Sequence, residues 1–303
     1  MTHIFIVNPY AGQKTFADDL RTKLVGIKGL NYFVFNTRYA GYEIELVQKI
    51  QRIFEGEKLR FYCCGGSGTM RNMLNGFENL KEVEVAFFPC GLTNDFLKIF
   101  GKDEKRFHQI EELINGDTIS VDYIQTNHGV ALNTVSVGMD SNNRLLFEKY
   151  RMLSVFNEQM PYNLSLLLSL FFSKSDAYEL YIDEKRVEGN FTEIILGNGN
   201  VLGGNLFFSR KADITDGIAS CSLIPDVQGI SLLPLLSAMQ KSDYDKVEKD
   251  LSCYECRQIR ILRKDRASFS MNLDGELIQN GSEWSAHIVR QGLHLVVPRG
   301  VRI

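Results

Sequence analysis

The sequence predicts two domains of different classes: an N-terminal doubly wound parallel α/β domain and a C-terminal, mostly antiparallel β-sandwich domain. Three observations support this. The length of 303 residues favours two domains over one. Apolar strand candidates alternate with amphipathic helical stretches over about the first 120 residues. After that point, strand-like runs separated by turn signals dominate. We expect the chemistry in the cleft between the two domains, where ligand sites are common.

The first domain is expected at residues 1–122, and a C-terminal tail of about 296–303 is expected to return to it. Helices of 10 to 15 residues between strands require right-handed crossovers and a parallel sheet. Ligands of such sheets bind beyond the carboxyl ends of the strands. The expected strands are 3–8, 31–36, 59–64 and 83–88, and the expected helices lie near 15–27, 42–54, 69–79 and 93–100.

The second domain is expected at residues 123–295. Short apolar runs bounded by turn residues are typical of an antiparallel sandwich or barrel. No linker rich in Pro or Ser separates the halves, so we expect them to pack closely. The strand-like runs are 118–125, 129–138, 177–182, 191–199, 217–226, 256–262, 267–275 and 294–298, with helical stretches near 140–172 and 229–249.

Composition restricts the function classes. A net charge of -3 with both signs interspersed disfavours nucleic acid as a partner. The N-terminus has no secretory signal pattern, so we expect a cytoplasmic protein. The longest apolar run, 164–172, is about half of the ~20 residues that a spanning helix needs. The CYEC stretch at 253–256 has no second ligand pair, which disfavours a zinc site.

The stretch YCCGGSGTMRNMLNG at 62–76 indicates a strand, a tight turn and a helix. At such a junction, backbone N–H groups and the positive end of the helix dipole favour a phosphate. The spacing fits neither of two common motifs. A dinucleotide fingerprint would need Gly in place of Arg71, and the Gly101-Lys102 pair is followed by Asp103 and not by the Ser or Thr of a Walker loop. A purely structural turn is the alternative to a phosphate cradle.

Four motifs in order resemble the diacylglycerol kinase catalytic-domain family of lipid kinases, a branch of the group that includes NAD kinases and phosphofructokinases. That family shows N-P-x-x-G, G-G-D-G-T, P-x-G-T-x-N-D-F and D-G-E. Segments 135–141, 203–209 and 216–226 are similar to its second domain, so the resemblance covers nearly the whole chain. The four motifs are NPYAGQK (8–14), GGSGTMRNMLNG (65–76), FPCGLTNDFLKIFG (88–101) and NLDGELI (272–278).

The resemblance implies a kinase that transfers the γ-phosphoryl group of ATP, with Mg²⁺, to a hydroxyl of diacylglycerol or a related lipid. Two positions depart from the family pattern: Ser67 replaces the acid of GGDGT, and Leu92 replaces a Thr. A serine lacks the charged oxygen that Mg²⁺ prefers, although it could position a water. A non-catalytic nucleotide- or lipid-binding relative and a kinase of a soluble hydroxyl therefore stay open as alternatives.

The resemblance also implies the residues of the nucleotide site. Lys14 either reaches a phosphate or is a solvated surface lysine. The Thr-Asn-Asp run at 93–95 is also typical of a helix N-cap, which is compatible with nucleotide binding. The implied ATP-binding residues are Asn8, Pro9, Gly12, Gly65, Gly66, Ser67, Gly68, Thr69, Thr93 and Asn94.

The implied metal ligands are Asp95 and Asp122 around the catalytic Mg²⁺, and Asp216 and Ile218 at a structural magnesium site for which a plain turn is the alternative. The implied catalytic pair is Asp274, as the base that takes the acceptor proton, and Glu276, as its partner or as a metal ligand. Without the resemblance, Asp274-Gly275 after a strand is only a turn signal.

The acceptor pocket should be apolar if the substrate carries acyl chains. The stretch 160–172 is apolar around most of a predicted helix, which fits lipid contact and packing within the second domain equally well. We expect the protein to work peripherally at the inner membrane surface on a lipid substrate. A homodimer is an open alternative to a monomer.

Overall fold

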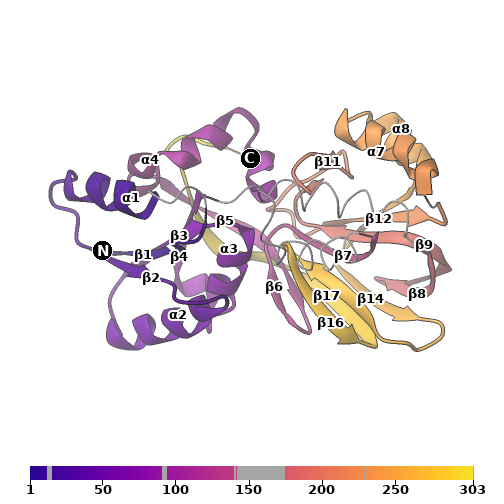
Figure 1. Cartoon of the computed structure of the whole chain (residues 1–303), viewed down its shortest axis with the longest axis horizontal. Helices are drawn as coiled ribbons and strands as arrows, with labels where there is room; N and C mark the ends of the chain where they lie inside the picture. The colour runs from indigo at the N-terminus through magenta and orange to yellow at the C-terminus, as the bar shows by residue number, and fades with distance from the viewer. Residues whose placement is uncertain (12–15, 91–93, 140, 142–174, 228, 303) are drawn as a thin grey trace, which may run out of the picture. The chain divides into compact units, whose positions relative to one another are not determined.

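The computed structural model describes residues 1–303 except 12–15, 91–93, 140, 142–174, 228 and 303 (Figure 1). The chain forms two compact units. The first unit contains residues 1–123 and 290–303, and the second contains residues 124–289. The chain therefore leaves the first unit once and returns to it once.

The first unit is built on a parallel sheet in the order β17-β4-β3-β1-β2. Its strands are β1 (Thr2–Val7), β2 (Tyr32–Asn36), β3 (Leu59–Gly65), β4 (Glu84–Pro89) and the end of β17 (Glu283–Val297), and β5 (Asp117–Thr126) begins in this unit. The helices are α1 (Phe16–Val25), α2 (Tyr42–Ile53), α3 (Ser67–Leu74) and α4 (Ile110–Ile114), with 3-10 helices η1 (Leu80–Glu82) and η2 (Asp95–His108). The predicted parallel α/β class is confirmed.

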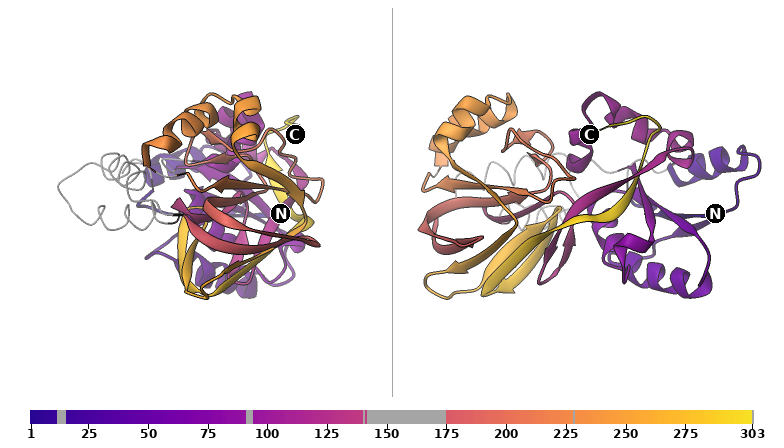
Figure 2. Two further views of the ribbon diagram at one scale, coloured as in Figure 1. Left: turned by 90° about the vertical axis from the view of Figure 1, so that its right-hand side faces the viewer. Right: turned by 180° about the vertical axis from the view of Figure 1, so that it is seen from behind.

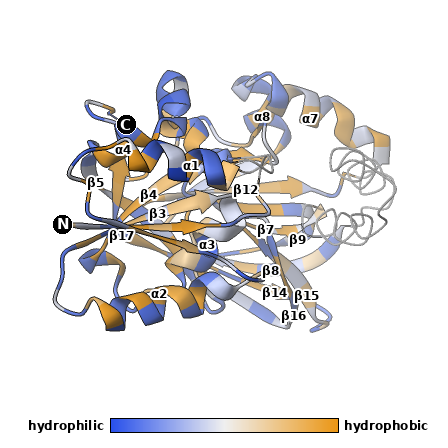
Figure 3. Ribbon diagram, turned by 60° about the vertical axis from the view of Figure 1, so that its left-hand side comes forward, coloured by the Kyte–Doolittle hydropathy of each residue, from blue (hydrophilic) through white to orange (hydrophobic). Residues whose placement is uncertain are grey.

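Burial explains why these segments form these elements. All six residues of β1 are buried, as expected for a parallel strand with both faces covered. Helix α2 instead buries one stripe, which includes Leu46, Val47 and Ile50. Figure 3 shows the contrast, with β3 and β4 largely hydrophobic and α2 carrying alternating hydrophobic and hydrophilic patches.

Two helices of this unit differ from the sequence-based expectation. The helix expected near 69–79 ends as an α-helix at Leu74, and η1 follows after a short connection. The stretch expected near 93–100 is a 3-10 helix that extends to His108. It is broken at Gly101, where φ is +53° and ψ is -116°. A glycine tolerates this backbone conformation, which a side chain would strain.

The run 294–298, expected among the strands of the second domain, lies in the first unit. His294, Leu295 and Val296 pair in parallel with Glu84, Val85 and Ala86 of β4. Leu293 and residues 295–297 are fully buried, which suits a strand inside a parallel sheet. The return to the first unit therefore starts at Arg290, ahead of the expected position near 296.

The second unit is antiparallel, with the strand order β16-β15-β7-β9-β8-β14-β17 and with β12 between β9 and β13. The predicted β-rich class is confirmed. The strands are β6 (Gly129–Ala131), β7 (Thr134–Gly138), β8 (Asp176–Ile182), β9 (Lys185–Gly197), β10 (Val201–Leu202), β11 (Leu206–Phe207), β12 (Ala219–Pro225), β13 (Ser252–Cys256), β14 (Gln258–Arg263), β15 (Phe269–Leu273) and β16 (Glu276–Gly281).

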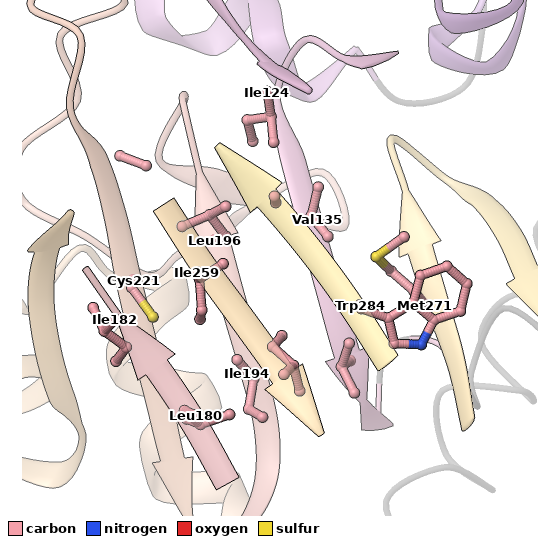
Figure 4. Packing of buried hydrophobic residues seen from close by; sticks show 14 of the residues in the cluster. Ile124, Val135, Leu180, Ile182, Ile194, Leu196, Cys221, Ile259, Met271 and Trp284 are labelled. Carbon is pink, nitrogen blue, oxygen red and sulfur yellow. The ribbon is translucent and has the colours of Figure 1, made fainter. Parts of the chain in front are cut away.

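The core of this unit lies on the inner faces of its strands. Leu180, Ile194, Ile259 and Trp284 are each at most 3% exposed, and Figure 4 shows several of these side chains gathered between the strands. A second cluster under helix α7 (Leu233–Gln240) contains Phe208. The 3-10 helix η3 (Gly229–Leu232) precedes α7, and helix α8 (Tyr244–Asp250) follows α7. Figure 2 shows α7 and α8 together on one side of the unit's strands.

The helical stretch expected near 140–172, with its apolar run 160–172, lies almost entirely outside the described residues. Across the part of the chain that the structure describes, no helix combines the length and the apolarity that a membrane-spanning segment requires.

Candidate active site

Three strand ends of the first unit meet at one edge of its sheet. Strands β1, β3 and β4 are parallel neighbours, so their carboxyl ends lie side by side. The ladder continues past the strands, because Asn8 N donates to Cys64 O at 2.9 Å and Cys90 N donates to Gly65 O at 2.8 Å. These bonds hold the starts of the three loops in register.

The middle loop leads directly into helix α3. Gly66 is extended, with φ -96° and ψ -174°, and the helix begins at Ser67 without a side-chain cap. Met70 N donates to Gly66 O at 3.0 Å, so the amides of Ser67, Gly68 and Thr69 precede the helical ladder. The first turn carries no acidic residue. The local charge therefore favours an anion at this end of the helix.

Close packing fixes the shape of the turn. A Cβ atom on Gly65 would lie 2.6 Å from both Cβ and Oγ1 of Thr69, so only glycine fits there without movement. Asn8 Nδ2 donates to Thr69 Oγ1 at 3.0 Å and thereby links the first loop to α3. Asn8 Oδ1 accepts from Tyr10 N at 3.0 Å. The structure thus brings together Asn8 and the Gly65–Thr69 turn, with half-buried Pro9 beside Asn8.

The third loop is described only in part. Asn94 and Asp95 are half-buried at the start of η2, where Leu97 N donates to Asn94 O at 3.0 Å. The Asn94 side chain makes no capping hydrogen bond, so a backbone bond closes this turn. Gly12, Lys14, Leu92 and Thr93 lie outside the described residues.

Asp122 is fully buried in β5, and its Oδ1 accepts from Gln291 N at 2.6 Å. Among the residues that the structure describes, no three or more His, Cys, Asp or Glu side chains gather as metal ligands would. Mg²⁺ commonly binds through one or two carboxylates together with substrate phosphates and water. Asp95 and Asp122 carry oxygen donors of that type, and their role as ligands of a nucleotide-bound metal stays a prediction.

The segment predicted to hold a structural magnesium forms a turn. Asp216 Oδ1 accepts from Ile218 N at 2.8 Å, and Gly217 between them has a φ of +79°. The Asp216 side chain is exposed. This is the turn that the sequence offered as the alternative, and the metal role of Asp216 and Ile218 stays a prediction.

Asp274 and Gly275 form the two-residue tip of the β15–β16 hairpin, because Leu273 pairs directly with Glu276. Their φ values are +48° and +88°. Two left-handed residues in succession are typical of a type I′ turn, for which Asp-Gly is a preferred pair. Glu276 is half-buried at the start of β16.

The Asp274 carboxylate is buried, with 8% exposure, and receives the amides of three successive residues. Leu132 N donates to Oδ2 at 2.5 Å, and Thr134 N donates to Oδ1 at 2.8 Å. Asn133 N lies 3.0 Å from Oδ1 and 3.3 Å from Oδ2. Sequence reasoning missed these contacts, because backbone donors about 140 positions away leave no sequence signal.

A buried amide network continues from this point. Asn133 Nδ2 donates to Val201 O at 2.9 Å, and Asn198 Nδ2 donates to Leu132 O at 2.9 Å. Asn198 N donates to Asn133 O at 2.8 Å. Sequence reasoning did not select Asn133 or Asn198. The GNGN stretch at 197–200, with its alternating glycines and amides, was the available hint.

The cysteines near the Gly65–Thr69 turn are not suited to nucleophilic chemistry. All six cysteines are free thiols. Burial raises the pKa of Cys63 and Cys64 well above the usual thiol range, and burial likewise raises the pKa of Cys90. These groups remain protonated thiols that pack as small hydrophobic side chains.

Comparison with known protein families agrees with an α/β unit followed by an antiparallel β unit. Residues 2–126 match the model of the diacylglycerol kinase catalytic domain. Residues 133–297 match the model of the YegS C-terminal NAD kinase beta sandwich-like domain. The chain therefore belongs to the diacylglycerol kinase catalytic-domain family with a YegS-type C-terminal domain.

Individual relatives agree with this assignment. A Staphylococcus carnosus (strain TM300) protein named "Putative lipid kinase" is 25% identical over 228 residues, which cover 72% of this chain and 70% of the relative. "Putative lipid kinase YtlR" of Bacillus subtilis (strain 168) is 31% identical over 117 residues, 37% of each protein. The crystal structure of a "putative diacylglycerol kinase" from Bacillus anthracis str. Sterne matches with a TM-score of 0.72 at 18% identity, covering 99% of this chain and 96% of that one. The fold is therefore shared.

Proposed function

We propose that this protein is an ATP-dependent lipid kinase that transfers the γ-phosphoryl group of ATP to a hydroxyl of diacylglycerol or a related lipid. One observation carries the proposal: three neighbouring strand ends surround the Gly65–Thr69 turn, which opens into a helix whose first turn has no acidic residue. Phosphoryl transfer depends mainly on positioning and charge neutralisation, which such a turn can supply.

The ATP phosphates would accept hydrogen bonds from the amides of Ser67, Gly68 and Thr69. Asn8 would hold the turn in place through the Thr69 hydroxyl, to which it already donates at 3.0 Å. When bound, Mg²⁺ would neutralise charge on the phosphates. Asp95 and Asp122 would hold that ion, and the Ser67 hydroxyl would orient a water in place of the family's carboxylate.

A transfer assay with a lipid acceptor tests the proposal. Purified protein is incubated with γ-labelled ATP, Mg²⁺ and diacylglycerol in mixed micelles, and the label is counted in the organic and aqueous phases. A lipid kinase places label in the organic phase. Label in a soluble product, when small alcohols replace the lipid, would favour the soluble-substrate alternative.

The non-catalytic alternative is favoured by one observation, the neutral Ser67 at the start of α3. Ser67→Asp separates the two functions. Under our proposal the native protein transfers phosphoryl, and the variant changes only the rate. If label reaches the lipid only with the variant, the native protein is a nucleotide- or lipid-binding relative.

We further propose peripheral binding at the cytoplasmic face of the membrane, through a neutral, apolar surface at the start of α7. Ile230 is 68% exposed and Leu233 is 49% exposed. The sequence 227–242 contains no Asp or Glu, and its charged residue is Lys241. A lipid bilayer suits this composition, because aliphatic side chains are buried at the boundary between headgroups and acyl chains, where a carboxylate would be costly to desolvate.

Vesicle sedimentation tests this surface. We expect the double variant Ile230→Ser and Leu233→Ser to lose most binding to phosphatidylcholine vesicles that contain diacylglycerol. Val25→Ser is the matched control, since Val25 is 77% exposed on helix α1. Equal loss in both variants would mean nonspecific adhesion, and no loss in the double variant would place the membrane contact elsewhere.

A further inference from the structure

We infer that Asp274 is a positioning residue and not the base. Its carboxylate holds the backbone of Leu132–Thr134 in place, an interaction that we call the pin, and it fixes the position of the hairpin tip that carries Glu276. The link between Asp274 and the reaction rests on the proposed kinase function. The hydrogen bonds of the pin do not depend on that function. The inference reassigns the role that the family resemblance implies for the first acid of the DGE motif.

Hydrogen-bond geometry is the first argument. A carboxylate offers about four lone-pair sites. Oδ1 of Asp274 accepts from Asn133 N and Thr134 N, and Oδ2 accepts from Leu132 N and Asn133 N. A general base must present an oxygen to the acceptor hydroxyl at about 2.6–3.2 Å. Asp274 already presents both oxygens to backbone donors.

The identity of the donors is the second argument. Three successive N–H groups that converge on one anion form a backbone nest. Amide donors stabilise the ionised carboxylate, and protonation of an oxygen would forfeit its bonds to these amides. Burial of Asp274 at 8% exposure keeps water from replacing the lost bonds. The arrangement favours a carboxylate that stays ionised. It does not favour a group that takes up and releases a proton in each turnover.

The pin is part of a larger buried assembly. Asp274 N also donates to Thr134 O at 3.1 Å, so the two segments are bonded in both directions. Asn133 and Asn198 extend the network to Val201. A Cβ on Gly199 would lie 2.2 Å from Asn133 Oδ1, which shows how closely the pinned segment is packed. Movement of Leu132–Thr134 would therefore disturb the neighbouring loop.

Asp274 acts on the reaction through Glu276. Asp274 is the first of the two turn residues and only Gly275 separates it from Glu276, so the position of Asp274 sets where β16 begins. Glu276, the second acid of the motif, follows directly and is half-buried. We assign the contact with the acceptor hydroxyl to Glu276 and the orientation of the hairpin tip to Asp274.

Asp274→Asn isolates the pin, because Asn tolerates the left-handed backbone and keeps the side-chain shape. It replaces one acceptor oxygen with an NH₂ group that faces amide donors. We expect hydrogen exchange of the Leu132–Thr134 amides to rise about tenfold or more. Glu276→Gln, the matched control on the same hairpin, should leave that exchange unchanged.

The pH dependence of kcat distinguishes a positioning residue from a base. We expect Asp274→Asn to lose roughly tenfold in kcat and to keep the acid limb of the wild-type profile. We expect Glu276→Gln, which removes the proposed contact with the acceptor hydroxyl, to lose about 10²–10⁴ in kcat. The inference is overturned if Asp274→Asn leaves the amide exchange unchanged, or if it removes the acid limb with a loss of about 10²–10⁴ in kcat.

If Asp274→Asn does not fold, Gly199→Ala gives a second test. It leaves Asp274 intact and displaces Asn133, so exchange at Leu132–Thr134 should rise and kcat should fall with the acid limb kept. Unchanged exchange in this variant would count against the pin. Hydrogen exchange needs no turnover, so an absence of phosphoryl transfer would refute the proposed function and leave the pin to be judged on exchange alone.

Discussion

Gly65→Ala is the sharpest perturbation of the proposed phosphate site. The added Cβ would lie 2.6 Å from Cβ of Thr69, about 0.8 Å short of the 3.4 Å at which ordinary van der Waals contact begins. Thr69 Cβ is fixed to the helix backbone, so rotation of the side chain cannot relieve the clash. The start of α3 must move, and its first-turn amides must move with it.

The expected cost follows from this displacement. Overpacking of a tight contact destabilises a protein by about 1–3 kcal/mol. A shift of about 0.8 Å would stretch an amide–phosphate bond from a typical length of about 2.9 Å to beyond hydrogen-bonding range. Loss of one bond to a charged group costs about 1.5–3 kcal/mol. We therefore expect the Kd for ATP to rise about 10- to 100-fold.

Isothermal titration calorimetry with Mg·ATP and thermal unfolding measure the two effects. Gly68→Ala is the control for stability, because its Cβ would meet nothing within 4 Å and it retains the amide. That variant should unfold at the wild-type temperature or slightly above it. The reasoning is refuted if Gly65→Ala binds ATP as the wild type does and also keeps wild-type stability.

Three further predictions concern stability. Arg60→Ala should destabilise the first unit by about 1–3 kcal/mol in chemical denaturation, because Glu84 loses the guanidinium 2.7 Å away, although Lys58 stays 3.0 Å from its other oxygen. Burial and the charge of nearby Arg60 lower the pKa of His3 to about 4, so folding favours neutral His3 and stability should fall as the pH drops from about 6.5 towards 4. His3→Gln should flatten that slope in denaturation curves measured across this range, and an unchanged slope would contradict the assignment. Trp284→Ala should cost the second unit about 3–5 kcal/mol in urea unfolding, because its indole is 1% exposed.

Local patterns predicted much of the fold. Apolar runs separated by amphipathic stretches located β1 to β4 and three of the following helices to within a few residues. The Gly-rich turn and its link to a helix were also readable, since glycine and helix periodicity are local signals. Tertiary packing decided the rest, such as the 3-10 geometry of η2 and its break at Gly101.

The sequence was less informative where partners are distant. Strand β16 and the first half of β17 were not predicted. In β17, Glu283, Ser285 and His287 face solvent, which leaves only Trp284 and Ala286 as the buried set. The pairing of the end of β17 with β4 depends on a partner some 200 residues earlier.

The candidate site shows the same division. The motif located Asp274 but not its role, because its partners are backbone amides that any residue would offer. The motif residues could be identified from the sequence. Their hydrogen-bond partners could be identified only from the fold.

A crystal structure with Mg²⁺ and a non-hydrolysable ATP analogue tests the central claim most directly. We predict that phosphate oxygens accept hydrogen bonds from the amides of Ser67, Gly68 and Thr69, at the ends of β1, β3 and β4. A nucleotide bound away from this turn, or no bound nucleotide at saturating concentration, would contradict the account.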